Sequence, residues 1–226
     1  MPGVLTDSVE IPTEGGQRID ADLVVPGGAL GLVVFAHGSG SSRFSSRNRA
    51  VAESLHARRL GTLLLDLLTR DEESVDQYTG EYRFDIERLG SRVVIATDSI
   101  QDRRDLHSFP LGYFGASTGA AAALIAAAER PALARAVVSR GGRPDLAGVA
   151  LAQVHAPTLL VVGGLDYTVI EMNQDAMSRM EAARVVELKI VAGATHLFEE
   201  PGTLQEVERL AGDWFERFLG ARIQAR

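Results

Sequence analysis

Short hydrophobic runs alternate with longer amphipathic stretches along most of this chain, which is the pattern of alternating strands and helices. The strands expected from these runs are residues 32–36, 62–67, 111–114, 136–138, 158–162 and 185–191. The helices expected between and after them are residues 50–59, 85–100, 118–130, 171–182 and 203–219. Strands such as residues 159–162 are almost continuously apolar, which suits a parallel sheet with both faces covered. The pattern predicts an α/β fold with a doubly wound sheet.

The first 25 residues follow a different pattern. Residues 4–11 and 18–25 are only partly apolar and flank a turn with two glycines, so they predict an antiparallel hairpin that brings the sheet to about eight strands. The least apolar segment, residues 70–82, is rich in Asp, Glu, Thr and Gly. We expect it to be a loop at the edge of the sheet where ligands bind, with no lid domain, leaving a shallow site.

Composition narrows the class of protein. A length of 226 residues fits a single domain, residues 1–226, and a net charge of −7 argues against nucleic acid or an anionic membrane as a partner. There is no cysteine, so disulfides and thiolate catalysis are excluded. No apolar run approaches the roughly 20 residues of a membrane span, and residues 1–10 lack a signal pattern, so we expect a cytoplasmic location.

The most informative motif is G-A-S-T-G at residues 115–119, where an expected strand passes into an alanine-rich helix. A sharp strand-to-helix turn strains the residue at its tip and requires small neighbours, which Gly115 and Gly119 supply. The turn would expose the Ser117 hydroxyl, and the first amides of the new helix would point at the same space. This indicates a nucleophile beside an anion site, whereas the alternative is a buried turn serine.

A serine nucleophile needs a base held by a carboxylate. After Ser117, the next expected strand to end in an acid leads to Asp166, and His196 follows the last expected strand. The order Ser, Asp, His, with each residue just beyond its strand, is the arrangement of the α/β-hydrolase fold. Asp145, which follows the preceding strand, stays open as the alternative acid. The other histidines, His37, His56, His107 and His155, are less suitably placed to be the base.

An oxyanion site is expected from the loop after the strand at 32–36, which reads His-Gly-Ser-Gly at residues 37–40. We assign its donors to the backbone amides of Ser39 and Thr118, with Gly38 keeping the loop tight beside the substrate. The loop lacks the G-K-[ST] ending of a P-loop, so nucleotide binding is not expected. No His, Asp and Glu cluster has metal-ligand spacing, and we expect neither a metal nor a cofactor.

Two arginines follow the strand after the nucleophile helix. Arg140 and Arg143 would reach the rim of the site, where a guanidinium could bind a substrate carboxylate. Ion pairing with Asp145 or with the acidic residues at 71–73 is the stronger interpretation for both.

These motifs together resemble bacterial α/β-hydrolases of the dienelactone hydrolase-like group. The resemblance rests on F-A-H-G at 35–38, the motif at 115–119, V-G-G-L-D at 162–166 and G-A-T-H at 193–196, and covers nearly the whole chain. It implies that Ser117 is the nucleophile, Asp166 the acid and His196 the base. Dienelactone hydrolases proper use a cysteine with a nearby glutamate, and this departure argues against dienelactone itself as the substrate. Residues 138–145 also resemble a subgroup attached to phosphoribosyltransferase domains, and we expect no such domain within these residues.

The sequence therefore predicts an enzyme, a carboxylic ester hydrolase that cleaves small esters or lactones through an acyl-enzyme. Two alternatives remain: a ligand-sensing module that does not turn over, and acyl transfer or perhydrolysis by the same triad.

Overall fold

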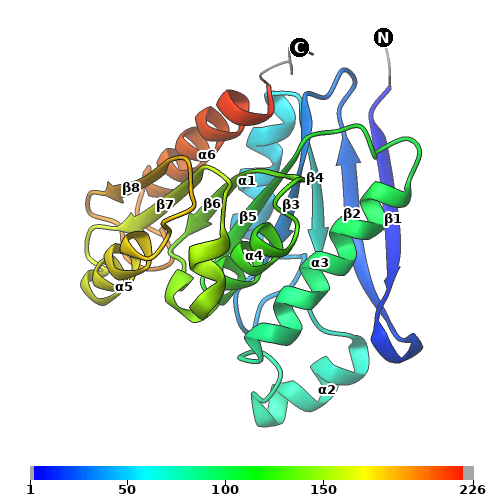
Figure 1. The fold of residues 1–226 in the computed structure, drawn as a ribbon, viewed down its shortest axis with the longest axis horizontal. Coiled ribbons are helices and arrows are strands. Elements are labelled where there is room, and N and C mark those ends of the chain that lie inside the picture. The colour runs from blue at the N-terminus through cyan, green and yellow to red at the C-terminus, as the bar shows by residue number, and fades with distance from the viewer. Residues whose placement is uncertain (1–2, 221–226) are drawn as a thin grey trace.

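The computed structural model describes residues 3–220, and within them eight strands form one sheet. The order across the sheet is β1-β2-β4-β3-β5-β6-β7-β8 (Figure 1). β2 runs antiparallel to both β1 and β4, and the remaining neighbours are parallel. The strands are β1 (Leu5–Pro12), β2 (Arg18–Val25), β3 (Gly31–Ala36), β4 (Leu60–Leu65), β5 (Leu111–Ala116), β6 (Ala134–Arg140), β7 (Thr158–Gly163) and β8 (Val186–Val191). The predicted α/β class, hairpin and mostly parallel sheet are confirmed.

Helices lie on both faces of this sheet, with α1 and α6 on one face and α3, α4 and α5 on the other (Figure 1). None of the helices within residues 3–220 combines the length and apolarity needed to span a membrane. The helices are α1 (Ser46–Ala57), α2 (Arg70–Thr79), α3 (Ile86–Asp102), α4 (Thr118–Glu129), α5 (Tyr167–Ser178) and α6 (Thr203–Leu219), with short 3-10 segments η1 (Glu14–Gly16) and η2 (Pro144–Gln153).

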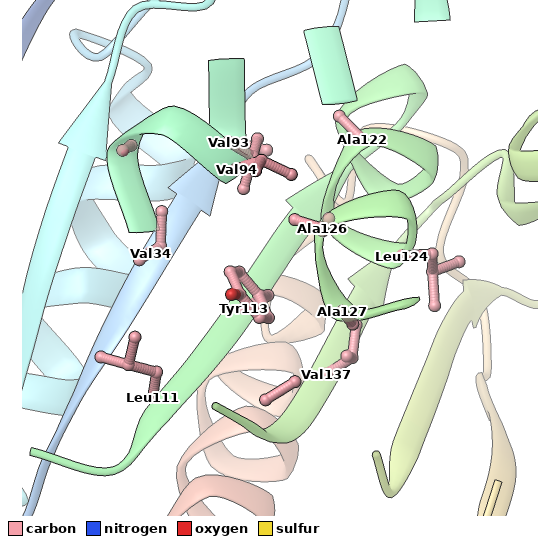
Figure 2. Close-up of a cluster of buried hydrophobic side chains, with 14 of the residues drawn as sticks. Val34, Val93, Val94, Leu111, Tyr113, Ala122, Leu124, Ala126, Ala127 and Val137 are labelled. Atoms are coloured by element: carbon pink, nitrogen blue, oxygen red, sulfur yellow. The ribbon is translucent and has the colours of Figure 1, made fainter. Parts of the chain in front are cut away.

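The two faces bury separate hydrophobic clusters, because successive strand side chains point to opposite sides. Phe35 and Phe114 stack at 4.7 Å between their ring centroids on the face covered by α1 and α6. On the other face Tyr113 and Val137 lie among side chains of α3 and α4, including Ala126 (Figure 2). The sheet is thus covered on both sides, as its continuously apolar strands require.

The alanine-rich α4 packs unusually close to its neighbours. A Cβ atom added at Gly90 of α3 would lie 2.7 Å from Cγ2 of Ile125, so the two helices approach at a position only glycine allows. Burial raises the pKa of Tyr113 to about 12, although its hydroxyl is 3.0 Å from Thr97 Oγ1. Helix α4 therefore packs directly against α3 on this face of the sheet.

The structure corrects the prediction for residues 70–82, since most of this segment is the helix α2 rather than a loop. Thr69 caps the helix: its hydroxyl accepts a hydrogen bond from the Glu72 amide, and the Glu72 side chain accepts one from the Thr69 amide. Asp76 then holds the turn that follows, accepting bonds from the amides of Tyr82 and Arg83. The helix depends on polar contacts, which hydrophobic periodicity does not detect.

Candidate active site

Ser117, the expected nucleophile, lies at a strained turn between β5 and α4. Ser117 has φ 50° and ψ −123°, a conformation that is rare for a residue with a side chain. A Cβ atom at Gly115 would lie 2.4 Å from the Ala120 Cα, and one at Gly119 would lie 2.3 Å from the Ala36 carbonyl oxygen. Both glycines are therefore required by close backbone contacts, as the motif predicted.

The loop after β6 holds this turn on both sides. The Ser117 amide donates to the Arg140 carbonyl oxygen at 3.2 Å, and the Arg143 amide donates to the Ser117 carbonyl oxygen at 3.0 Å. These two bonds fix the backbone of Ser117 in its strained conformation, so the direction of its hydroxyl is determined by the sheet and not by a free loop.

His37 organises the loop expected to carry an oxyanion donor. The Leu67 amide donates to His37 Nε2 at 3.1 Å, so the proton of the neutral ring is on Nδ1, which donates to the Gly38 carbonyl oxygen at 2.9 Å. Burial lowers the pKa of His37, outweighing the bond to Gly38 and the nearby carboxylate of Asp66. This neutral side chain ties the loop after β3 to the loop after β4.

Gly38 brings the same loop against Ser117. A Cβ atom at this position would lie 3.0 Å from the Ser117 Cβ and 3.8 Å from its Oγ. The loop can pass this close to Ser117 because Gly38 has no side chain.

The two expected oxyanion donors differ in their hydrogen bonding. The Ser39 amide donates to the hydroxyl oxygen of Thr118 at 2.9 Å. Thr118 is the first residue of α4, so its own amide has no partner within the helix. The sequence analysis assumed that both amides were free. The hydrogen bond between Ser39 and the Thr118 side chain could not be expected from the sequence, because the two residues are 79 positions apart.

The structure brings Asp166 and His196 together at the carboxyl edge of the sheet. His196 Nδ1 donates to Asp166 Oδ2 at 2.7 Å, with the carboxylate side chain 16% exposed and the imidazole 38% exposed. This bond leaves Nε2 as the acceptor of the neutral ring. Within the part of the chain described, no hydrogen bond joins Ser117 Oγ to His196, and such contacts are often long before substrate binds.

Close backbone contacts hold the two loops that carry this pair. The Leu165 amide donates to the Ala194 carbonyl oxygen at 2.9 Å. A Cβ atom at Gly163 would lie 2.5 Å from that same oxygen, and one at Gly141 would lie 3.0 Å from the His196 carbonyl oxygen. The loop after β8 therefore rests on glycines at the ends of β6 and β7.

Two further residues support His196 and were missed by sequence reasoning. Glu200 accepts bonds from the Thr195 amide at 3.1 Å and from its hydroxyl at 2.6 Å, which closes the loop. Phe198 is buried with φ 56°, a strained conformation directly after the histidine turn. Neither role follows from residue type or spacing, because both depend on how the loop after β8 folds.

The alternative acid Asp145 and two of the other histidines have hydrogen-bond partners elsewhere. Asp145 accepts two bonds from the Arg143 guanidinium, at 2.9 and 2.7 Å, which is the ion pair that the sequence favoured. His56 lies 2.7 Å from the Thr62 hydroxyl, and His107 lies 2.9 Å from the Arg104 carbonyl oxygen.

Arg140 is not at an accessible rim, and within residues 3–220 it does not form the expected ion pair with Asp145 or with residues 71–73. Its side chain points to the face of the sheet covered by α1, where it is 7% exposed, donates to Asn48 Oδ1 at 3.3 Å and lies over the Phe198 ring. Burial, and after it the nearby Arg47 cation, lowers the pKa of Arg140 to about 10. The alternation of side chains along β6 explains the difference, because the end of the strand still points its residues into the layers.

A cavity of about 410 Å³ opens beside the loop after β3. Its lining is mostly polar and charged, with Phe44 and Leu68 as the large apolar contributions. Among residues 3–220, no group of three His, Asp or Glu side chains is arranged to hold a metal ion.

A strained serine between β5 and α4, a carboxylate after β7 and a histidine after β8, on a sheet of this order, define an α/β-hydrolase. Comparison with known proteins agrees. The profile of the dienelactone hydrolase family matches residues 20–220, and the chain belongs to this family of hydrolases.

Relatives in sequence and structure extend this result. A crystal structure of dienelactone hydrolase from Anabaena variabilis is 52% identical with a TM-score of 0.91, covering 95% of this chain and 98% of that one. Est1E from Butyrivibrio proteoclasticus shares the fold, with 15% identity, a TM-score of 0.77 and coverage of 94% and 99%. Two Mycobacterium tuberculosis proteins with the curated name "Putative phosphoribosyl transferase" are 52% identical over 214 residues, which is 95% of this chain and 47% of theirs. The chain thus spans about half the length of these curated relatives.

Proposed function

We propose that this chain is a serine hydrolase that cleaves small carboxylic esters or lactones through an acyl-enzyme on Ser117. The observation that carries the proposal is the hydrogen-bonded pair of His196 and Asp166 at the same edge of the sheet as the strained Ser117 turn. A hydroxyl held at such a turn, with a neutral imidazole oriented by a carboxylate, is the arrangement that activates serine.

In the first half of the reaction Ser117 Oγ attacks the ester carbonyl carbon while His196 Nε2 takes the hydroxyl proton. Asp166 keeps the proton on Nδ1 and stabilises the imidazolium that forms. The ester C–O bond then breaks, and His196 returns the proton to the departing alkoxide. In the second half, water attacks the acyl-enzyme with His196 again acting as the base, and Ser117 is regenerated.

The negative charge on the carbonyl oxygen develops beside the start of α4. The unpaired Thr118 amide supplies a hydrogen-bond donor there, and the helix N-terminus favours negative charge. The Ser39 amide lies beside it, bonded to the Thr118 hydroxyl. Gly38 leaves room for the bound acyl group, because any side chain at this position would press against Ser117.

The name of the curated relatives refers to chains about twice as long, and we assign no phosphoribosyl transfer to these residues. The site on this chain has the parts of an acyl-transfer catalyst, and the loop at residues 37–42 lacks the sequence of a P-loop.

Turnover of short p-nitrophenyl esters and of small lactones tests the proposal. We expect measurable hydrolysis by the wild-type chain that falls by about 10⁴-fold or more in Ser117→Ala, a substitution that retains the fold. Binding without turnover would support a sensing module instead, and preferential transfer of the acyl group to an added alcohol or peroxide would support an acyltransferase or perhydrolase.

A further inference from the structure

The Thr118 hydroxyl is the hydrogen-bond acceptor of the Ser39 amide, which is one of the two expected oxyanion donors. Its hydroxyl oxygen accepts the Ser39 N–H at 2.9 Å, so that amide is already hydrogen-bonded when no substrate is bound. An incoming carbonyl oxygen cannot use the Ser39 N–H unless the threonine rotates away. The Ser39 amide is therefore bonded to a side chain of α4 before any substrate binds.

The proton of this hydroxyl has no acceptor in the described part of the chain. Threonine in a helix interior usually donates to a carbonyl one turn earlier. Thr118 is the first residue of α4, and the chain before it belongs to β5, so no helical carbonyl is available. The hydroxyl therefore accepts one bond from Ser39 and retains a free donor.

Backbone contacts keep the hydroxyl in place. A Cβ atom at Gly119 would lie 2.3 Å from the Ala36 carbonyl oxygen and 2.4 Å from that of His37, so α4 begins in direct contact with the end of β3. Thr118 itself is 4% exposed, which restricts its rotation. A donor fixed in this way requires little reorganisation when charge develops.

We propose that the Thr118 hydroxyl is an oxyanion donor, so that one residue supplies both its amide and its side chain to the developing charge. This inference rests on the proposed serine hydrolase function and refines its oxyanion site. The Ser39 N–H acts through the hydroxyl: by donating to Thr118 Oγ1 it polarises the O–H bond and strengthens the hydrogen bond that the proton makes to the oxyanion. The hydroxyl keeps its proton throughout.

Three variants of Thr118 test the proposal on the full chain. Thr118→Val keeps the shape and removes the hydroxyl, Thr118→Ala removes it without adding a branched side chain, and Thr118→Ser retains it. With p-nitrophenyl acetate, we expect kcat to fall by about 10²- to 10³-fold in the Val and Ala variants, with KM within about threefold of wild type. The Ser variant should stay within about tenfold of wild type.

A transition-state probe separates donation from a structural role. A small trifluoromethyl ketone forms a hemiketal with a catalytic serine, and its oxyanion occupies the same site as that of the ester. Its inhibition constant should rise in Thr118→Val by a factor similar to the loss in kcat, and recover in Thr118→Ser. If the substitution only loosened the loop at residues 37–40, KM would rise and the melting temperature would fall, but the inhibition constant would not change in parallel with kcat.

Thr158→Val is the matched control, because Thr158 is also buried and its hydroxyl donates to the Ala156 carbonyl oxygen at 3.0 Å, at the opposite end of β7 from the site. Its kcat should stay within about twofold of wild type. A Thr118→Val enzyme with kcat within threefold of wild type, or an impaired Thr118→Ser, would overturn the inference alone. A wild-type chain that neither hydrolyses esters nor binds the ketone would remove the proposed function and this inference with it.

Discussion

At the residue scale, backbone strain marks the site. Within residues 3–220 the non-glycine residues with positive φ are Arg59, Ser117 and Phe198. Two of these three lie in the proposed machinery, one at the nucleophile and one beside the histidine turn. Each such conformation costs about 1–3 kcal/mol and persists only where surrounding contacts enforce it. At Ser117 those contacts are the hydrogen bonds with the backbone of Arg140 and Arg143.

The carboxylate partner of His196 gives a direct mutational test. Asp166→Asn is expected to lower kcat by about 10⁴-fold while leaving the melting temperature close to wild type, because an amide no longer enforces the required tautomer. Asp145→Asn is the matched control, since Asp145 is paired with Arg143 and not with His196. Steady-state hydrolysis of a p-nitrophenyl ester provides the measurement. Near wild-type turnover by Asp166→Asn would mean that a residue other than Asp166 is the acid.

His37 predicts a pH effect on stability. Its buried ring has a lowered pKa, so between that value and the ordinary histidine value of about 6.5 the unfolded chain binds more protons. The stability contributed by neutral His37 is therefore fully present above about pH 6.5 and is lost as the pH falls below it.

In His37→Phe, the Leu67 amide loses its acceptor, which costs about 1–3 kcal/mol of unfolding free energy at pH 8. Urea unfolding of both proteins at pH 8 and pH 5 measures the difference, which should shrink at the lower pH. A difference that is constant across this range would mean that the ring does not titrate as described.

At the element scale, α2 is attached to α3 by a buried ionic cluster. Glu72 Oε1 accepts bonds from Arg88 at 2.7 Å and from Arg92 at 2.8 Å, and its other oxygen accepts the Thr69 amide. Burial acts to raise the pKa of Glu72, but the Thr69 bond and the two guanidinium groups outweigh it and lower the pKa overall. The Glu72 carboxylate thus joins the start of α2 to two arginines of α3.

Replacing that carboxylate should loosen α2. Glu72→Gln leaves the buried Arg92 without its anionic partner, and we expect a loss of about 3 kcal/mol of unfolding free energy at pH 7 and faster amide exchange in α2. The pKa of Glu72 is lowered on folding, so its contribution is complete above the ordinary glutamate value and is lost as the pH falls through the lowered one. Glu73→Gln, at an exposed position on the same helix, is the control. Equal urea-unfolding midpoints for both variants would contradict this account of the helix.

The sequence predicts some elements much better than others, for physical reasons. Continuously apolar strands such as β7 and the strongly amphipathic α6 are evident because burial alone determines them. The polar α2 was missed because its stability comes from contacts of Glu72 and Asp76 with other segments. The sequence does contain a T-x-x-E pattern at residues 69–72, which is typical of a helix start, but no hydrophobic periodicity follows it.

The same distinction applies to the candidate site. Ser117, Asp166 and His196 could be proposed because each comes after a strand of the expected parallel sheet, β5, β7 and β8. The hydrogen bond between Ser39 and Thr118, and those of His37, could not be predicted, since they depend on how loops far apart in the sequence meet. The burial of Arg140 could not be predicted either, because it depends on the direction of the side chain at the end of β6 and on its contact with Asn48 of α1.

At the scale of the whole molecule, we expect the polar cavity next to the loop at residues 37–40 to limit the size of the acyl group. The cavity of about 410 Å³ beside the loop after β3 has a lining that includes Asp66, Arg70 and Glu73, which gives a long acyl chain little apolar surface. Each methylene contributes about 0.8 kcal/mol only when it is fully buried. Activity on p-nitrophenyl esters should peak between acetyl and butyryl and fall beyond about eight carbons. A maximum at decanoyl or longer would show that α2 closes over the substrate as a lid.

The central claim is that Ser117 is an activated nucleophile, and covalent labelling tests it most directly. Incubation with an organophosphate ester such as diethyl p-nitrophenyl phosphate should add one phosphoryl group per chain, with release of one p-nitrophenolate. Peptide mass spectrometry should locate the group on Ser117, and Ser117→Ala should remain unmodified. Labelling at another residue, or a folded wild-type chain that is not labelled, would contradict the account.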